Sequence, residues 1–147
     1  MKVAFKKNIT SVFGRLITLW TKGKYCHTEL VFSDGRWFSS DESDKGSRFL
    51  VGPKTGCEYD YLDVPITPED EARILKFCES ENGLPYDKKG IGFSFLPIPL
   101  GYQSENAWFC SEICTAALQI AQYCSGYTPA RVHPNKLYKI LSTELSK

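Results

Sequence analysis

The stretch YCHTELVFSDGRWFSS, residues 25–40, is the part of the sequence that most clearly predicts a fold. Two runs rich in β-branched and aromatic residues lie on either side of Asp34-Gly35, a dipeptide that favours the tight turn of a β-hairpin. We therefore expect two antiparallel strands within a small sheet.

The segments around this hairpin predict helices and one further strand. Residues 57–65, CEYDYLDVP, alternate in polarity as a strand does. Residues 8–21 place apolar side chains at helical spacing and predict an amphipathic helix, its apolar positions being Ile9, Val12, Phe13, Leu16, Ile17 and Trp20.

A second helix is predicted over residues 67–83, with signals at both ends. Thr67 is suited to the N-cap, with Pro68 in the first turn and Asp70 placed to close a capping-box-like pair. Gly83 ends the helix. Its buried stripe is expected to contain Ile74, Phe77 and Cys78, so Cys78 is interpreted as a packing residue.

The C-terminal half is predicted to hold an irregular stretch followed by two helices. Residues 84–102 are rich in Gly and Pro and are of the kind that lines or covers sites. A helix is expected from about residue 109 to 124. A short helix beginning at Pro134 or Asn135 is expected near the end of the chain.

Composition indicates one domain of 147 residues with a sufficient core. The formal net charge of +1 gives no reason to expect a nucleic-acid partner. The basic residues among the first 24 are interpreted as a solvated surface. No apolar run is long enough for a transmembrane helix, and the N-terminus lacks a signal-peptide pattern, so we expect a cytoplasmic protein. The sequence leaves the oligomeric state open.

Six cysteines are present, and without an export signal we expect free thiols. Cys110 and Cys114 have the i, i+4 spacing of two zinc ligands on one helix face, and His27 is a candidate third ligand. A structural zinc site normally needs two such short pairs, and only one is present. We therefore expect neither a metal nor a cofactor.

The stretch AWFCSEICTAAL, residues 107–118, places Cys110 at the start of a helix. At 100° per residue, Cys110 and Cys114 fall on one side, nearly opposite a polar face that includes Ser111, Glu112 and Thr115. A buried cysteine is ordinarily a packing residue, which is our interpretation of Cys114. The first turn of a helix, however, favours a thiolate, and its free N–H groups can hold an oxyanion.

A nucleophilic cysteine needs a base, and the chain has only two histidines. His133 precedes a proline and is interpreted as a solvated or capping residue. His27 lies within the first hairpin strand, and Glu29 follows on the same face, where a carboxylate can orient the imidazole and stabilise its charge. A strand histidine is more often structural, but Cys110, His27 and Glu29 together predict a cysteine nucleophile, ionised and open to a cleft.

KYCHTELVFSDG followed by WFCSEICTAAL resembles the circularly permuted branch of the NlpC/P60 papain-like superfamily, especially YiiX-like and small phage or prophage proteins. The histidine precedes the cysteine, as the permuted order requires, and Pro85, Tyr86 and Asp87 extend the likeness. The resemblance implies an α+β, circularly permuted papain-like domain over residues 1–147, with a small antiparallel sheet packed on helices. It also implies that Cys110 is the nucleophile and His27 the general base.

The third polar position of the site departs from the family. Members of the acyltransferase type have a second histidine twelve residues after the first, where this chain has Ser39. Either Ser39 orients His27 or Glu29 has taken that role, and we favour Glu29 because a buried carboxylate needs such a partner. Tyr86 and Trp108 are the residues expected to line the substrate site.

The resemblance implies acyl chemistry. The leading hypothesis is an amidase or peptidase acting on a peptide or cell-wall-type amide. The first alternative is a thioesterase or lipid acyltransferase with the same Cys-His pair, in which GIGFSFLPIPLGY, residues 90–102, could floor an apolar channel. The second alternative is a non-catalytic, phage-type host-interaction module that retains the fold.

Overall fold

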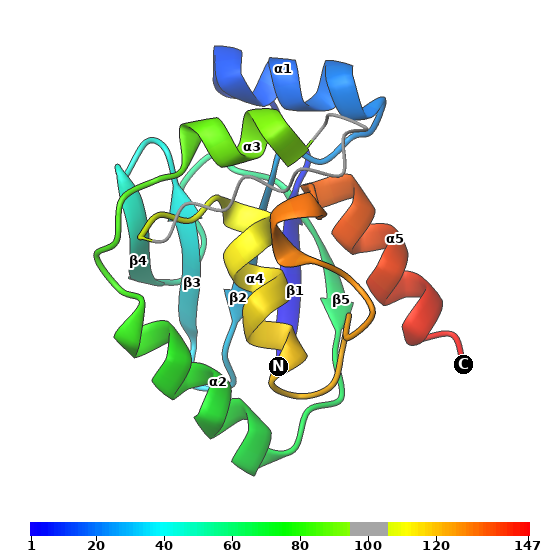
Figure 1. The fold of residues 1–147 in the computed structure, drawn as a ribbon. Helices are drawn as coiled ribbons and strands as arrows, with labels where there is room; N and C mark the ends of the chain where they lie inside the picture. The colour runs from blue at the N-terminus through cyan, green and yellow to red at the C-terminus, as the bar shows by residue number, and fades with distance from the viewer. Residues whose placement is uncertain (95–105) are drawn as a thin grey trace.

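The computed structural model describes residues 1–94 and 106–147, which form an α+β arrangement around one five-stranded antiparallel sheet (Figure 1). The strand order is β4-β3-β2-β1-β5. The strands are β1 (Lys2–Lys6), β2 (His27–Val31), β3 (Arg36–Asp41), β4 (Gly46–Val51) and β5 (Tyr59–Asp63). The helices are α1 (Val12–Thr21), α2 (Pro68–Ser80), α3 (Lys88–Ser94), α4 (Cys110–Gln119), the short 3-10 helix η1 (Pro129–Arg131) and α5 (Pro134–Glu144).

The predicted hairpin is confirmed as β2 and β3, and the predicted strand at 57–65 is β5. Gly35 takes a φ of +89° at the turn, a conformation that glycine adopts readily. Strands β1 and β4 were not predicted from the sequence. β1 pairs with β2 on one side and β5 on the other, so partners distant in sequence, rather than a local pattern, specify it.

The sheet is strongly curled. The rings of Trp37 on β3 and Tyr59 on β5 lie 5.2 Å apart, centroid to centroid, although β2 and β1 separate these two strands in the sheet. Twist and coiling on this scale turn one face of the sheet into a concave surface, which Trp37 and Tyr59 help to fill. Glu29 lies on the same face, because the Tyr59 hydroxyl donates a hydrogen bond to it.

Helix α4 packs on the other face, against β2 and β3, and α2 and α5 in turn contact α4. Figure 1 shows α4 crossing in front of the central strands. The main core lies between these helices and the sheet and includes Phe5, Leu30, Phe38, Ile113, Leu118 and Leu141. This packing fixes the first turn of α4 relative to the start of β2.

The structure confirms α2 and its cap: the Thr67 side chain accepts a hydrogen bond from the Asp70 N–H at 3.1 Å. Asp70 thus pairs with Thr67 through its N–H, and its carboxylate also binds Arg73. Ile74 and Cys78 are buried as predicted, and Phe77 is partly buried.

Residues 84–102 were expected to be irregular, and this is wrong for 88–94, which form α3. Residues 95–102, which complete the expected apolar floor, lie outside the described part of the chain. Helix α4 ends at Gln119 rather than near residue 124, because Gln122 and Cys124 take positive φ angles that end helical geometry. Helix α5 begins at Pro134, as predicted.

Helix α1 forms within the predicted range, with the Ser11 side chain capping its N-terminus by accepting from the Gly14 N–H at 3.0 Å. Its apolar positions do not all face the core. Ile17 is buried, whereas Val12, Leu16 and Trp20 are exposed. Across the two described ranges, no helix has the length and apolar character needed to cross a membrane.

Candidate active site

Cys110 is the first residue of α4, where the sequence places it. The residue before it, Phe109, is the N-cap of the helix; it is fully buried and has an extended backbone (φ −101°, ψ 165°). The first N–H groups of a helix have no intrahelical acceptor. Cys110 therefore lies beside donors that have no acceptor within the helix, at the positive end of the helix dipole.

His27, the first residue of β2, interacts with this cysteine. Burial lowers the pKa of His27, but the negative charge of Cys110, a hydrogen bond to its sulfur and the Glu29 carboxylate outweigh this and raise the pKa to about 10. The charges of Cys110 and Glu29 thus favour the protonated form of the imidazole. A protonated imidazole beside a thiol stabilises the thiolate form.

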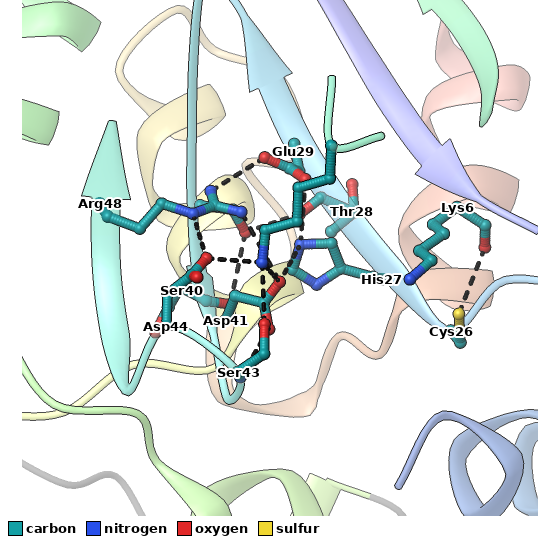
Figure 2. Close-up of polar contacts among 12 residues, drawn as sticks. Lys6, Cys26, His27, Thr28, Glu29, Ser40, Asp41, Ser43, Asp44 and Arg48 are labelled. Atoms are coloured by element: carbon teal, nitrogen blue, oxygen red, sulfur yellow. Dashed lines mark hydrogen bonds and ion pairs between the residues drawn. The ribbon is translucent and has the colours of Figure 1, made fainter. Parts of the chain in front are cut away.

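The other side of the imidazole faces two carboxylates, as Figure 2 shows. His27 Nε2 lies 3.4 Å from Glu29 Oε1 and 3.7 Å from Asp41 Oδ2. These are ion-pair distances; Nε2 is buried and has no well-aligned hydrogen bond within residues 1–94 and 106–147. Because Nε2 faces the carboxylates, Nδ1 is the nitrogen available to Cys110.

Glu29 is fully buried and is held by two groups besides His27. Its Oε2 accepts a hydrogen bond from Arg48 Nη1 at 2.9 Å, and its Oε1 accepts one from the Tyr59 hydroxyl at 3.1 Å. Burial raises the pKa of Glu29, but the opposing effects of His27 and Arg48 are larger and lower it to about 2. Glu29 is therefore a buried, charged carboxylate with a partner at each of its two oxygens.

Asp41 lies in a second layer of charges. Its Oδ2 is 2.8 Å from Lys54 Nζ, and Asp44 bridges Lys54 and Arg48 at 2.7 Å each. Although burial raises the pKa of Asp41, the positive charge of His27 and the Lys54 hydrogen bond hold it well below the usual range. The result is a network of three cations and three carboxylates: His27, Arg48, Lys54, Glu29, Asp41 and Asp44.

Four residues of the site were not predicted from the sequence: Asp41, Arg48, Lys54 and Tyr59. The hairpin register carried a signal for the first of these. Leu30 pairs with Phe38 and Val31 with Trp37, and continuing this register places Asp41 opposite His27. Arg48 could not be found this way, because it lies on β4, which was not predicted; there it pairs with Ser39.

Ser39, the alternative orienting residue, has a different partner. It is buried, and its Oγ donates to the Thr28 carbonyl at 2.6 Å. The groups that the structure brings to Nε2 of His27 are instead Glu29 and Asp41.

A cavity of about 310 Å³ opens beside the site. His27, Asp41 and Tyr86 line it together with residues of α1. Trp108 lies elsewhere: its Nε1 donates to Glu81 Oε2 at 2.8 Å, and its ring contacts Phe77. Tyr86 is therefore at the cavity, as expected of a substrate-lining residue, and Trp108 is in the packing against α2.

The expectation that Cys110 is open to a cleft is wrong for this structure, since the residue is only 1% exposed. Ile17, Ile91 and Phe109 form a small apolar cluster next to the start of α4, and Tyr86 packs against it. Ile17 and Tyr86 also line the cavity, and Phe109 directly precedes Cys110, so the cluster connects the cavity lining to the packing at the start of α4.

The polar face expected opposite Cys110 is also buried at Ser111, Glu112 and Thr115. Helix α4 is enclosed on both sides, and Glu112 uses its carboxylate to accept from the Phe109 N–H at 3.4 Å. Burial raises the pKa of Glu112 to about 7; the Phe109 N–H opposes this rise, and the charge of Asp87 adds to it. Glu112 thus titrates near neutral pH inside the core.

We expect Glu112→Gln to change how stability depends on pH. The folded-state pKa of Glu112 is about 7 against an ordinary 4.5, so the folded wild type loses stability relative to the unfolded chain as pH rises from 4.5 through 7. Glutamine should remove up to about 3 kcal/mol of this loss. Urea unfolding of both proteins across that pH range measures it, and parallel curves would contradict the burial argument.

The remaining buried cysteines fit packing roles. Burial raises the pKa of Cys78 and Cys114 well above the ordinary range and that of Cys124 to about 12. All six cysteines have free thiols.

His133 caps α5 by accepting from the Lys136 N–H. In the described part of the chain, no three of the His, Cys, Asp and Glu side chains are grouped so as to hold a metal ion.

No protein-family model, no curated protein and no solved structure matches this chain. A cysteine at a helix N-terminus, a protonated histidine and a supporting carboxylate form the arrangement that nucleophilic cysteine chemistry requires.

Proposed function

We propose that this protein is a cysteine hydrolase that cleaves acyl compounds through a covalent intermediate on Cys110. The observation that supports this most strongly is the interaction of Cys110, at the first position of α4, with the protonated imidazole of His27. The permuted NlpC/P60 papain-like family, which the sequence resembles, is part of the same proposal.

The reaction follows from the positions of these groups. The Cys110 thiolate attacks the carbonyl carbon of the substrate, a C–S bond forms, and the N–H groups of the first turn of α4 stabilise the oxyanion. His27 gives its proton to the leaving amine as the C–N bond breaks. Neutral His27 then takes a proton from water, the hydroxide attacks the thioester, and cleavage of the C–S bond restores the thiolate and the protonated imidazole.

The carboxylates at Nε2 have a defined part in this cycle. Glu29 and Asp41 hold the imidazole with Nε2 away from the thiol, so that Nδ1 is directed to Cys110. They also stabilise the protonated ring, the form required at the start of the reaction. Their own ion pairs with Arg48 and Lys54 keep both carboxylates charged.

The cavity has groups that can bind an amide substrate. Most of its lining residues are polar or charged, with Lys6, Lys54, Asp41 and Glu42 among them. Such side chains can pair with the backbone and charged groups of a peptide. We therefore retain a peptide or cell-wall-type amide as the leading substrate class.

Trapping of the acyl-enzyme tests this function. The protein is incubated with peptide-amide, thioester and ester probes, and the intact mass and the released products are measured. We expect an acyl adduct on Cys110 and turnover of the peptide amide, with Cys110→Ala lowering turnover by at least about 1,000-fold because the nucleophile is lost.

Cys114→Ala is the matched control, because Cys114 lies one turn further along the same helix, buried on the same side. It should retain both the adduct and turnover. An adduct that forms equally well on Cys110→Ala would show reaction at another group and contradict the proposal. Absence of any adduct in the wild type would favour a non-catalytic binding module, and turnover of thioesters alone would favour a thioesterase.

A further inference from the structure

Helix α1 presents an apolar surface to solvent. At 100° per residue, four of its side chains fall within an arc of about 100°. They are Val12, Leu16, Leu19 and Trp20, which are 78%, 55%, 76% and 65% exposed. Ile17, on the other side, packs with Ile91 of α3. Figure 1 shows α1 at the outer edge of the molecule above α3, far from α2.

An exposed group of this kind is unusual for a free surface. Single exposed apolar residues are common, but contiguous patches usually mark an interaction site. Here a four-residue arc runs along the whole helix, from its first residue to its last turn. We will call these four residues the α1 face.

The part of the chain that contains α1 carries charges of one sign. Residues 1–28 contain six Lys or Arg residues and no Asp or Glu. Arg15 borders the α1 face and Lys22 follows the last turn. Neither makes an ion pair with any residue that the structure describes, and the same is true of exposed Lys89 on neighbouring α3. These three cations are therefore available to an anionic partner.

We propose that the α1 face docks on an anionic lipid bilayer. Its apolar side chains enter the boundary between headgroups and acyl chains, and Arg15, Lys22 and Lys89 contact lipid phosphates. An apolar helix face edged by cations, with a tryptophan in the apolar part, has the chemistry that binds such a surface. A second copy of this chain fits less well, because pairing through the same face would bring like charges together.

Docking would also set the position of the cavity relative to the bilayer. Ser11, Gly14 and Ile17 line the cavity from the inner side of α1. A bilayer bound on the outer side of the helix would therefore lie close to the cavity, at a distance set by one helix diameter, roughly 10 Å. This surface goes beyond the proposed function and does not depend on Cys110 being catalytic.

Co-sedimentation of the full chain with vesicles tests the proposal. Vesicles of phosphatidylcholine alone and of phosphatidylcholine with phosphatidylglycerol are compared. We expect binding to the anionic vesicles only, weakened by added salt. Leu16→Gln/Leu19→Gln should reduce it by at least ~10-fold because two of the inserted side chains are lost. Val51→Gln is the matched control, since Val51 is 93% exposed but lies on β4, and should bind as the wild type does.

Charge and fluorescence give independent readouts. Arg15→Gln/Lys22→Gln/Lys89→Gln should lose the preference for anionic vesicles, whereas removal of Lys76, Lys139 and Lys147, exposed on α2 and at the C-terminal end, should not. Tryptophan emission should shift to the blue with vesicles, and Trp20→Phe should abolish the shift. Equal binding to both vesicle types, or binding unaffected by the Leu16 and Leu19 changes, would overturn the proposal. A dimer detected by sedimentation, and dissociated only by the Leu16 and Leu19 changes, would also overturn the proposal. Cys110→Ala should bind normally, which separates this test from that of the proposed function.

Discussion

Replacing His27 with alanine is expected to slow the alkylation of Cys110 by iodoacetamide about 10- to 100-fold near neutral pH. The protonated imidazole of His27, with a pKa of about 10, is the positive charge next to the sulfur. Without it the thiol should behave as an ordinary cysteine, of which only about a few per cent is thiolate at pH 7. Reaction rates of folded protein over a range of pH, with the labelled cysteine identified by peptide mass, measure the effect.

The burial of Cys110 must be separated from its ionisation in this experiment. The same packing of Ile17, Ile91 and Phe109 at the start of α4 is expected in the wild type and in His27→Ala. The ratio of the two rates therefore reports mainly the loss of the charge. His133→Ala, a change at the other histidine, is the control and should leave the rate unchanged, since His133 caps α5. If Cys110 reacts no faster than buried Cys78 or Cys114 in the wild type, it is a packing residue.

The parts of the fold that the sequence predicted are those with strong local signals. Asp34-Gly35 between two apolar runs predicted the β2–β3 hairpin, and the Thr67-Pro68 start predicted α2. Both depend on backbone preferences within a few residues. The same is true of the site: Cys110 in a first helical turn and His27 with Glu29 on one strand face are local features, and the structure brings all three together.

The parts that were missed depend on contacts between distant residues. β1 has only five residues and is specified by pairing on both edges. Arg48 meets Glu29 only because β4 joins β3 in a particular register. The burial of Glu112 follows from packing on both sides of α4, whereas the helical projection of an isolated sequence assigns polar residues to a solvent face. These features are properties of the assembled sheet.

Curvature of the sheet explains why Glu29 has more partners than the sequence suggested. The hydroxyl of Tyr59, on β5, reaches a carboxylate on β2 because the sheet coils around its concave face. Glu29 thus forms ion pairs with both His27 and Arg48. Its contributions to stability and to reactivity can be separated by substitution.

Glu29→Ala is expected to destabilise the protein by about 3 kcal/mol, because the buried Arg48 guanidinium loses one of its three carboxylate partners and the Tyr59 hydroxyl loses its acceptor. The folded-state pKa of Glu29 is about 2 against an ordinary 4.5, so the carboxylate's contribution is present above pH 4.5 and lost as pH falls through 2. The difference in unfolding free energy between wild type and variant should therefore shrink on acidification. Urea unfolding at several pH values measures it.

A second pair of variants distinguishes support of the fold from support of His27. Adding Arg48→Met to Glu29→Ala should recover part of the lost stability, because it removes a buried cation that has lost its Glu29 partner. Glu29→Ala should also slow the alkylation of Cys110, because Nε2 of His27 loses the closer of its two carboxylates, at 3.4 Å against 3.7 Å for Asp41. Adding Arg48→Met should not restore this rate, because the carboxylate is still missing. If the double variant regains both stability and reactivity, Glu29 only neutralises Arg48. Asp41→Asn, which keeps the Glu29–Arg48 pair, should then be the change that slows Cys110.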